Sequence, residues 1–407
     1  MLYKIFLNVF YEIQGINLYI NPFNVIICVI LIISGMNLFS KTYMYLTVAR
    51  GIKLQNNLAL FSNHRDERLK ALSNYCEDKQ RSLNSNFALI IGETHNRSHM
   101  SVYGYERDTT PWLNTIIENE KNIVLTKSFS CAAQTQPALE MALTEKNQYN
   151  NCKSNDAMTI VEMAQHAGFQ VIWISNQQND TIAGRIAEES DKVFWVNTNK
   201  NDTYLTQKNT LFDYNIYNKL NELKPEKKKT LYVIHLLGSH ASYDCRYPIG
   251  FGKWDDNNII NAYDNSVLYN DYIMEKIYDI LFSKFNVDCL MYFADHGEEL
   301  NKYFCHGTDF FLDNYKKSDY VKDIVKIPVY FCFSDNYMKN NKLKVDNLYL
   351  NKDRYFTNDI VYDTLMGIMG IERCHYNSIY DLTSENYSLN IKSAKTIGGN
   401  VKIEECL

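Results

Sequence analysis

Three apolar runs of the sequence end in residues that bind metal ions or carry protons. The three clusters read Ile91-Gly-Glu-Thr-His95, His235-Leu-Leu-Gly-Ser-His240 and Phe293-Ala-Asp-His-Gly-Glu298. In open parallel sheets, ligands bind beyond the carboxyl ends of the strands. If the three runs are neighbouring strands, their polar ends therefore form one site.

Asp295-His296-Gly297 is the sharpest of these signals, because a carboxylate and an imidazole lie side by side and the glycine lets the backbone turn away. Glu93 would add an oxygen ligand from a second strand, and His306 follows on the loop after the third run. One Glu, one Asp and up to three His suit zinc or another first-row metal. The alternative is an acidic strand end that caps the next helix. His240 fits either this site or a structural histidine.

A metal site without redox ligands points to Lewis-acid chemistry, which needs a nucleophile. Small and hydroxyl residues at 128–137 precede the helix-prone segment 138–143. A hydroxyl of this segment would then lie at a helix N-terminus, where the helix dipole favours negative charge. The alternative is that Thr135 is an ordinary N-cap before Pro137. The remaining histidines are expected to be structural, at the surface or without a clear role: His64, His95, His99, His166, His235 and His375.

The elements that would position these residues follow a regular alternation. Apolar runs rich in Val, Ile, Phe and Tyr alternate with helix-length segments; the runs cover 87–91, 170–174, 231–235, 289–293 and 327–331. This pattern predicts a mainly parallel sheet covered by helices on both faces. Residues 157–167 are predicted to form a helix that Gly168 ends.

Composition excludes several classes of protein. The chain has 407 residues, is 46% hydrophobic and carries a formal charge of -5, which argues against a disordered chain and against one made mostly of membrane spans. It has no long basic tract, so nucleic acid is not an expected partner, and Lys227-Lys228-Lys229 is typical of a solvated loop. The ten cysteines form no CxxC pair. Cys131, Cys152 and Cys245 are the better candidates for disulfides.

The N-terminal part has a different character. Residues 23–39 are uncharged and apolar, near the lower limit of about 17 residues for a membrane span. We expect a single membrane anchor within residues 1–40, with a buried or interfacial helix as the alternative. The predicted organisation continues with a linker or stalk at 41–85, a catalytic domain at 86–390 and a C-terminal tail at 391–407.

The chain resembles the catalytic domain of bacterial phosphoethanolamine transferases, members of the sulfatase and alkaline-phosphatase superfamily. The resemblance covers about residues 86–387. It rests on motifs in the family's order: Ile91-Gly-Glu-Thr94, His99-Met-Ser-Val-Tyr-Gly-Tyr105, Arg107-Asp-Thr-Thr-Pro111, Ser130-Cys-Ala-Ala-Gln-Thr135, Trp173-Ile-Ser-Asn-Gln177, His235 to Tyr243, Arg246-Tyr-Pro248, Asp295-His-Gly-Glu298 and His306-Gly307. It implies a three-layer α/β/α, alkaline-phosphatase-like domain with a mostly parallel sheet, held at the bacterial inner membrane and facing the periplasm.

The resemblance also implies roles for single residues. Glu93, Thr135, Asp295 and His296 would hold the catalytic zinc, and Thr135 would be the nucleophile. His240 and His306 would bind the phosphoryl group or a second zinc and transfer protons. The donor would be phosphatidylethanolamine, and the acceptor lipid A or a lipopolysaccharide core sugar.

The sequence departs from the family pattern in two places. Enzymes of this kind usually carry several membrane helices, whereas one is expected here. Met141 stands where a disulfide partner of Cys131 would be sought, so Cys131 is free or paired elsewhere.

The same motifs are compatible with other functions. One is a metal-dependent phosphodiesterase, phosphatase or phosphoglycerol transferase on the same scaffold, and another is an inactive membrane-anchored binding protein. Sulfatase activity is not favoured, because Cys131-Ala-Ala-Gln-Thr135 lacks the proline and arginine of that motif.

Overall fold

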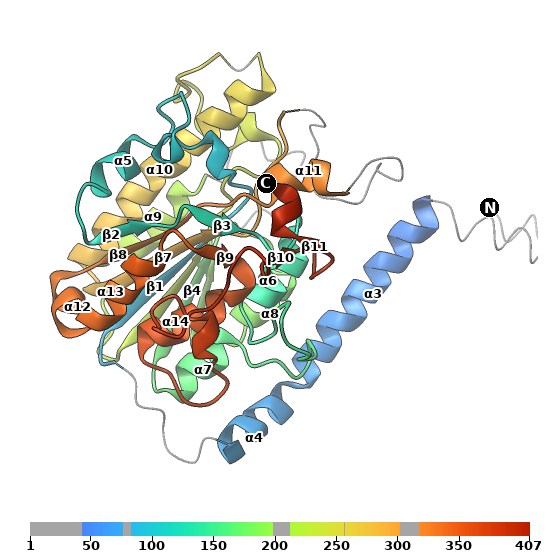
Figure 1. The fold of residues 1–407 in the computed structure, drawn as a ribbon, viewed down its shortest axis with the longest axis vertical. Helices are drawn as coiled ribbons and strands as arrows, with labels where there is room; N and C mark the ends of the chain where they lie inside the picture. The colour runs from blue at the N-terminus through green and yellow to red at the C-terminus, as the bar shows by residue number, and fades with distance from the viewer. Residues whose placement is uncertain (1–42, 76–82, 198–211, 256, 302–316) are drawn as a thin grey trace, which may run out of the picture. The chain divides into compact units, whose positions relative to one another are not determined.

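The computed structural model describes residues 43–75, 83–197, 212–255, 257–301 and 317–407 (Figure 1). The chain divides into two compact units, residues 1–60 and 61–407. The predicted anchor at 23–39 lies outside the described residues. Within the described ranges, every helix is too short or too polar to cross a lipid bilayer.

A seven-stranded sheet forms the centre of the unit 61–407, in the order β2-β8-β7-β1-β6-β4-β5. The strands are β1 (Asn86–Gly92), β2 (Asn122–Val124), β4 (Gln170–Ser175), β5 (Lys192–Trp195), β6 (Thr230–His235), β7 (Val287–Ala294) and β8 (Val329–Phe333). β8 pairs antiparallel with both β7 and β2, and the other pairs are parallel. The mainly parallel sheet is thus confirmed.

The register of the central strands determines where their ends lie. Ile91 of β1 pairs with His235 of β6 on one side and with Phe293 of β7 on the other. The three strands therefore end side by side, and the three polar clusters that follow them meet at one edge of the sheet.

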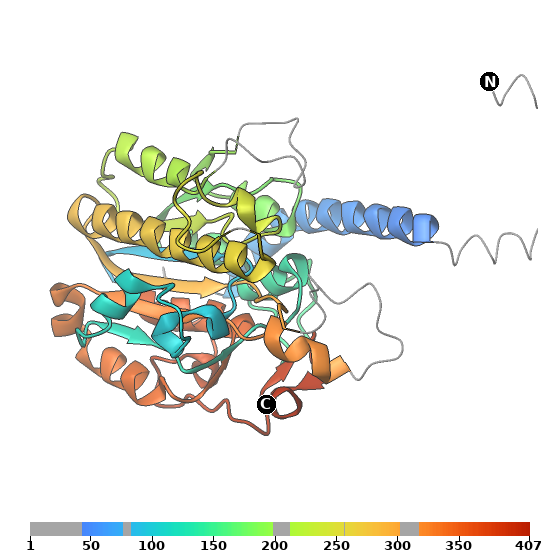
Figure 2. The same ribbon diagram turned by 90° about the horizontal axis from the view of Figure 1, so that it is seen from above.

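Helices cover both faces of the sheet, as Figure 2 shows with α9 and α10 on one face and α12 to α14, in orange and red, on the other. The helices of this unit beyond residue 100 are α5 (Pro111–Ile116), α6 (Thr135–Ala142), α7 (Ile160–His166), α8 (Ile182–Ala187), α9 (Tyr214–Glu222), α10 (Ile259–Ser283), α11 (Lys317–Ile324), α12 (Asp335–Asn340), α13 (Lys342–Asn351) and α14 (Val361–Met369). Side chains of α5, α9 and α10 share one buried apolar cluster with Ala88 and Ile90 of β1. This arrangement is the expected three-layer α/β/α fold.

Local capping explains the boundaries of α7. The helix begins at Ile160, three residues after the predicted start, because Thr159 and Glu162 form a reciprocal capping box. The helix ends at His166, and Gly168 two residues later adopts a left-handed φ of 85°, a conformation that suits glycine. The chain then enters β4, as the sequence predicts.

A helix within the predicted linker contributes to the unit 61–407. The described part of the chain opens with α3 (Tyr43–Asn63), and α4 (Arg65–Tyr75) follows it. On α4, Arg68 is 2% exposed and binds Glu162 at 2.9 Å and Glu189 at 2.8 Å. Burial, together with the charge of Glu162, raises the pKa of Glu189 to about 7. A buried ion cluster therefore fastens α4 to the helical layer that contains α7.

The C-terminal segment, predicted as a tail, forms structure. β10 (Lys395–Thr396) and β11 (Val401–Lys402) pair as an antiparallel hairpin, and a 3-10 helix, η6 (Ile403–Cys406), follows. Thr396 and Ile403 are fully buried. A second small sheet pairs β3 (Lys127–Phe129) in parallel with β9 (Tyr355–Thr357), and the 3-10 turn η4 (Asn358–Ile360) comes directly after β9.

Candidate functional site

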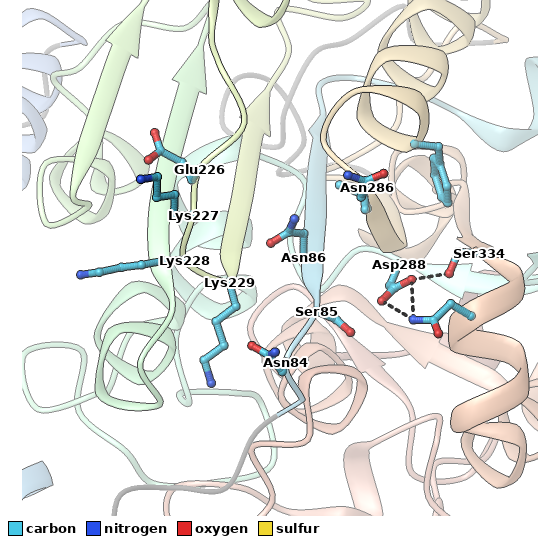
Figure 3. A pocket seen from close by; sticks show the side chains of 13 residues that line it. Asn84, Ser85, Asn86, Glu226, Lys227, Lys228, Lys229, Asn286, Asp288 and Ser334 are labelled. Carbon is cyan, nitrogen blue, oxygen red and sulfur yellow. Dashed lines mark hydrogen bonds between the residues drawn. The ribbon is translucent and has the colours of Figure 1, made fainter.

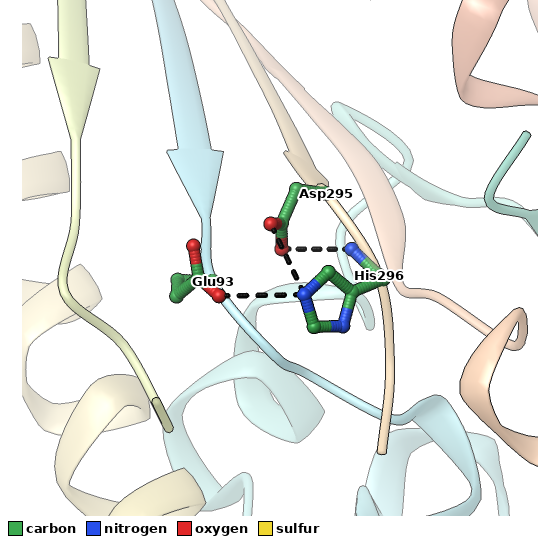
Figure 4. Close-up of side chains that lie close together, drawn as sticks. All are labelled: Glu93, Asp295 and His296. Carbon is green, nitrogen blue, oxygen red and sulfur yellow. Dashed lines mark hydrogen bonds and ion pairs between the residues drawn. The ribbon is translucent and has the colours of Figure 1, made fainter. Parts of the chain in front are cut away.

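Three predicted metal ligands meet at the carboxyl edge of the sheet (Figure 4). Glu93 follows β1, and Asp295 and His296 follow β7. His296 Nε2 lies 3.5 Å from Glu93 Oε1 and 3.5 Å from Asp295 Oδ2. All three residues are buried, and one potential ligand atom from each lies within 4.8 Å of the others.

Backbone N–H groups fix the carboxylate of Asp295. Its Oδ1 accepts bonds from the backbone N–H of Thr94 at 3.0 Å and of His296 at 2.7 Å. Its Oδ2 is buried and has no hydrogen-bond partner in the described part of the chain. A buried acceptor without a partner is costly, and a bound cation would satisfy it.

The Nε2 atom of His296 lies near Asp295 Oδ2, where it could bind the same cation. Its Nδ1 lies 2.7 Å from the carbonyl oxygen of Gly297, which makes Nδ1 the donor and leaves a lone pair on Nε2. A Cβ on Gly297 would lie 2.9 to 3.0 Å from three carbonyl oxygens, among them those of Lys326 and Ile324. Only glycine therefore allows this close approach of the loop.

Thr135 is the first residue of α6, and its hydroxyl faces the three ligands. Its Oγ1 lies 3.3 Å from both carboxylate oxygens of Glu93 and 3.4 Å from His296 Nε2. The N-cap position belongs to Gln134, whose side chain makes no capping bond. The alternative in which Thr135 is an ordinary N-cap is therefore wrong.

Two carboxylates share this buried site, and their pKa values move apart. Burial first, and then the charge of Asp295, raise the pKa of Glu93 well above its ordinary value. Burial also acts to raise the pKa of Asp295, but His296 and the N–H groups of Thr94 and His296 outweigh it and lower that pKa. Two carboxylates, one imidazole and a hydroxyl form a donor set that fits zinc.

Two further side chains orient Glu93. Thr94 Oγ1 donates to Glu93 Oε1 at 2.7 Å. Gln177, two residues beyond the end of β4, donates from Nε2 to Glu93 Oε2 at 3.3 Å and to the carbonyl of Leu236 at 2.9 Å. Sequence reasoning missed Gln177 as a site residue, although its place just after an apolar run is the signal that indicated the other three clusters.

The loop after β6, which carries His240, lies against the backbone of Glu93. Ser239 donates its N–H to the carbonyl of Glu93 at 3.0 Å, and Gly238 has a left-handed φ of 55°. The buried carboxylate of Asp213 fixes this loop by accepting the N–H groups of Leu237 and Gly238, both at 2.8 Å. Nothing in the sequence indicated this role for Asp213.

The two other histidines predicted to take part in the site are His240 and His306. The Nδ1 of His240 lies 2.9 Å from the carbonyl of Ala241, and His240 does not belong to the group of Glu93, Asp295 and His296. His306 lies outside the described residues.

Two buried histidines that follow β1, His95 and His99, do not belong to the group of metal ligands. His95 Nδ1 lies 2.5 Å from the hydroxyl of Tyr292, and burial lowers the pKa of His95 to about 4. His99 is buried and lies 2.8 Å from Asp264, which also binds Arg107 at 2.7 Å. These contacts give His95 and His99 structural partners.

The three loop cysteines named as candidates for disulfides, Cys131, Cys152 and Cys245, are thiols, which for Cys131 is one of the two expected outcomes. Cys131 is buried in a small apolar cluster that contains Met141, the residue at the expected partner position. Burial raises the pKa of the Cys131 thiol well above its ordinary value, which keeps it protonated. Cys374 is disulfide-bonded.

A cavity of about 520 Å³ lies at the opposite edge of the sheet (Figure 3). Its lining includes Asn86 at the start of β1, Val287 at the start of β7 and the three lysines 227–229. The lysine side chains diverge, and Lys227 and Lys228 are exposed, as expected of a solvated loop. The cavity is therefore separate from the metal-ligand group.

Several relatives with curated functions are phosphoethanolamine transferases. The chain is 31% identical over 251 residues to phosphoethanolamine transferase EptC of Escherichia coli K12, covering 57% of this chain and 42% of that protein. It is 26% identical over 302 residues to phosphoethanolamine transferase EptA of Helicobacter pylori, covering 69% of this chain and 52% of the relative. The chain thus spans about half the length of these relatives, and the resemblance read from the motifs is confirmed.

The fold and the family agree with this resemblance. The crystal structure of the C-terminal periplasmic domain of EptC from Escherichia coli, in complex with Zn, superposes with a TM-score of 0.68 at 24% identity, covering 80% of this chain and 92% of that domain. This likeness confirms the alkaline-phosphatase-like fold. The sulfatase family profile matches residues 85–371, which is more than half of the chain. The chain therefore belongs to the sulfatase family.

Proposed function

We propose that this protein is a zinc-dependent phosphoethanolamine transferase that uses Thr135 as its nucleophile. The donor is phosphatidylethanolamine, and the acceptor is lipid A or a lipopolysaccharide core sugar. One observation carries the proposal: the Thr135 hydroxyl lies 3.3 to 3.4 Å from Glu93 and His296 at the start of a helix. The names of the relatives and the zinc in the EptC domain support it.

Glu93, Thr135, Asp295 and His296 would hold the metal. When bound, zinc lowers the pKa of a coordinated hydroxyl and neutralises charge on phosphoryl oxygens. The orphaned Oδ2 of Asp295 and the Nε2 of His296 are the two atoms best placed to accept it. The site takes one zinc, or two if His240 and His306 bind a second.

The transfer would proceed in two displacement steps. Thr135 Oγ attacks the donor phosphorus, the bond to diacylglycerol breaks, and phosphoethanolamine remains on Thr135 as a covalent intermediate. An acceptor hydroxyl or phosphate then attacks the same phosphorus and releases Thr135. His240 and His306 are proposed to bind the phosphoryl group and to exchange the protons of the leaving and attacking oxygens. The N-terminus of α6 adds a favourable field for the anionic group.

These substrates place the protein at the bacterial inner membrane, with the catalytic domain facing the periplasm. The segment 23–39 is proposed as its membrane anchor, on the basis of its uncharged apolar sequence.

The test uses the zinc-loaded chain and phosphatidylethanolamine labelled in its headgroup. The wild type should accumulate label on Thr135, detected by mass spectrometry of the peptide, and Thr135→Ala should not. Thr144→Ala is the control, because Thr144 is a nearby threonine whose hydroxyl donates to the carbonyl of Glu140 and does not face the three ligands. Full transfer by Thr135→Ala would overturn the mechanism, and release of free phosphoethanolamine without an acceptor would indicate a phosphodiesterase.

A further inference from the structure

The backbone that leads into Thr135 is held from two sides. Cys131 donates its N–H to Asn358 Oδ1 at 2.8 Å. On the other side, Thr396 Oγ1 donates to the carbonyl of Ser130 at 2.7 Å, and Gly398 donates its N–H to the carbonyl of Cys131 at 2.9 Å. Ser130, Cys131, Asn358 and Thr396 are all fully buried. Three consecutive polar groups of this loop are thus fixed without water.

Asn358 joins the Thr135 loop to the metal-ligand loop. Besides accepting from Cys131, its amide donates to the carbonyl of Asp295 at 2.7 Å and to the carbonyl of Ala294 at 3.3 Å. Ser130 Oγ donates to the same Asp295 carbonyl at 2.5 Å. One carboxamide therefore fixes the spacing between the segment that ends in Thr135 and the segment that carries Asp295 and His296.

Thr396 belongs to the β10–β11 hairpin, which lies beyond the family match that ends at residue 371. Gln148 connects this hairpin to η4. Its amide donates to the carbonyl of Lys395 at 2.9 Å and accepts the N–H of Gly399 at 2.7 Å, and its backbone N–H binds Asp359 at 2.8 Å. The hairpin and Asn358 consequently form one connected support.

We propose that Asn358 and Thr396 are positioning residues that set the place of the Thr135 hydroxyl relative to Asp295 and His296. This inference rests on the proposed function, in which Thr135 is the nucleophile. Neither side chain touches the ligand atoms, so their loss shifts the nucleophile without removing a ligand. Misplacement of a reacting group by about 1 Å costs up to about 100-fold in rate.

The decisive variant is Thr396→Val, which keeps the shape of the side chain and removes the donor to Ser130. Its control is Thr383→Val, because Thr383 is a buried threonine whose hydroxyl binds Asp381 instead. We expect Thr396→Val to lower kcat for Thr135 labelling by at least about tenfold. KM for the donor should stay within about twofold, as in the control, and both variants are assayed at saturating zinc, because Thr135 is itself a proposed zinc ligand. Asn358→Asp, which turns a donor into an acceptor against the Asp295 carbonyl, should act in the same direction.

A measurement that needs no activity distinguishes failure of the positioning role from failure of the proposed function. Hydrogen exchange of the zinc-loaded protein, followed by mass spectrometry, reports the loop without any activity. Thr396→Val should speed exchange in the peptide covering residues 130–135, while exchange across β1 and β7 stays as in the wild type. Unchanged exchange together with unchanged kcat would overturn the positioning role. A wild type that never labels Thr135 would overturn the proposed function, and the exchange result would still decide the role of the hairpin.

Discussion

Thr94 donates its backbone N–H to Asp295 Oδ1 at 3.0 Å and so ties the loop after β1 to the loop after β7. The bond fixes the rotation of the Asp295 carboxylate and turns Oδ2 toward His296. Thr94 adopts a left-handed φ of 58° to make it, which is unusual for a β-branched residue. Strain of this kind persists where the surrounding structure fixes it, and here it accompanies the proposed metal site.

Replacement of Asp295 should strongly weaken zinc binding. Asp295→Asn keeps the shape of the side chain but removes the charge and one lone-pair donor, so zinc affinity should fall by more than about 100-fold. Titration calorimetry with zinc measures this directly. Asp288→Asn is the control, since Asp288 lies at the other end of β7 and binds Asn336. Equal affinities of the two variants would remove Asp295 from the ligand set.

Gln177 should increase the affinity of the site for zinc, although it is not a proposed ligand. Gln177→Leu removes the donor to Glu93 Oε2, and loss of such an outer partner typically weakens metal affinity by about 10- to 100-fold. Gln165→Leu is the matched control, because Gln165 donates to Glu189 and Asp191 instead. Both variants are compared by zinc titration against a competing chelator. Unchanged affinity in Gln177→Leu would mean that Thr94 alone orients Glu93.

Arg68 should be important for stability. Arg68→Met leaves Glu162 and Glu189 buried without their cation, and breaking a buried ion pair from one side costs about 3–5 kcal/mol. Urea unfolding measures the loss. Arg185→Met should cost less than about 1 kcal/mol, because Arg185 pairs with Glu188 near the surface. A loss in Arg68→Met no larger than in the control would show that α4 is only loosely fastened.

Stability should decline in acid partly because of His235. Burial lowers the pKa of His235 from its ordinary 6.5 to about 4. Between these two pH values His235 is therefore protonated in the unfolded state and neutral in the folded state. Between pH 6.5 and 4 this group lowers the free energy of unfolding by up to about 1.4 kcal/mol per pH unit as the pH falls. Wild type and His235→Leu, both stripped of metal, are compared by urea unfolding at several pH values. Identical pH slopes would contradict this assignment.

The sequence was most informative where structure and chemistry are local. The five apolar runs became strands, and Glu93, Asp295 and His296 were found because each directly follows such a run. The direction of β8 could not be predicted, because an apolar run has the same composition whether its strand is parallel or antiparallel.

Residues whose roles depend on distant segments could not be found in this way. Asn358 lies 227 positions after Cys131, which it binds, and Asp213 is followed 24 positions later by Leu237. Such polar residues have no local periodicity that marks them. Thr135 is an intermediate case: the sequence left it open between a cap and a nucleophile, and the start of α6 excluded the cap.

The central position of β1 has a consequence for how the protein reaches its native state. Thr94 and Asp295 are 201 positions apart, yet their strands are neighbours. Contacts of such long sequence separation form slowly, because the chain must lose much entropy before they are made. Metal ligands from both loops can assemble only after β7 has joined β1. Zinc would therefore bind the finished sheet and stabilise it by mass action, so metal supply during folding would influence how much of the protein survives proteolysis.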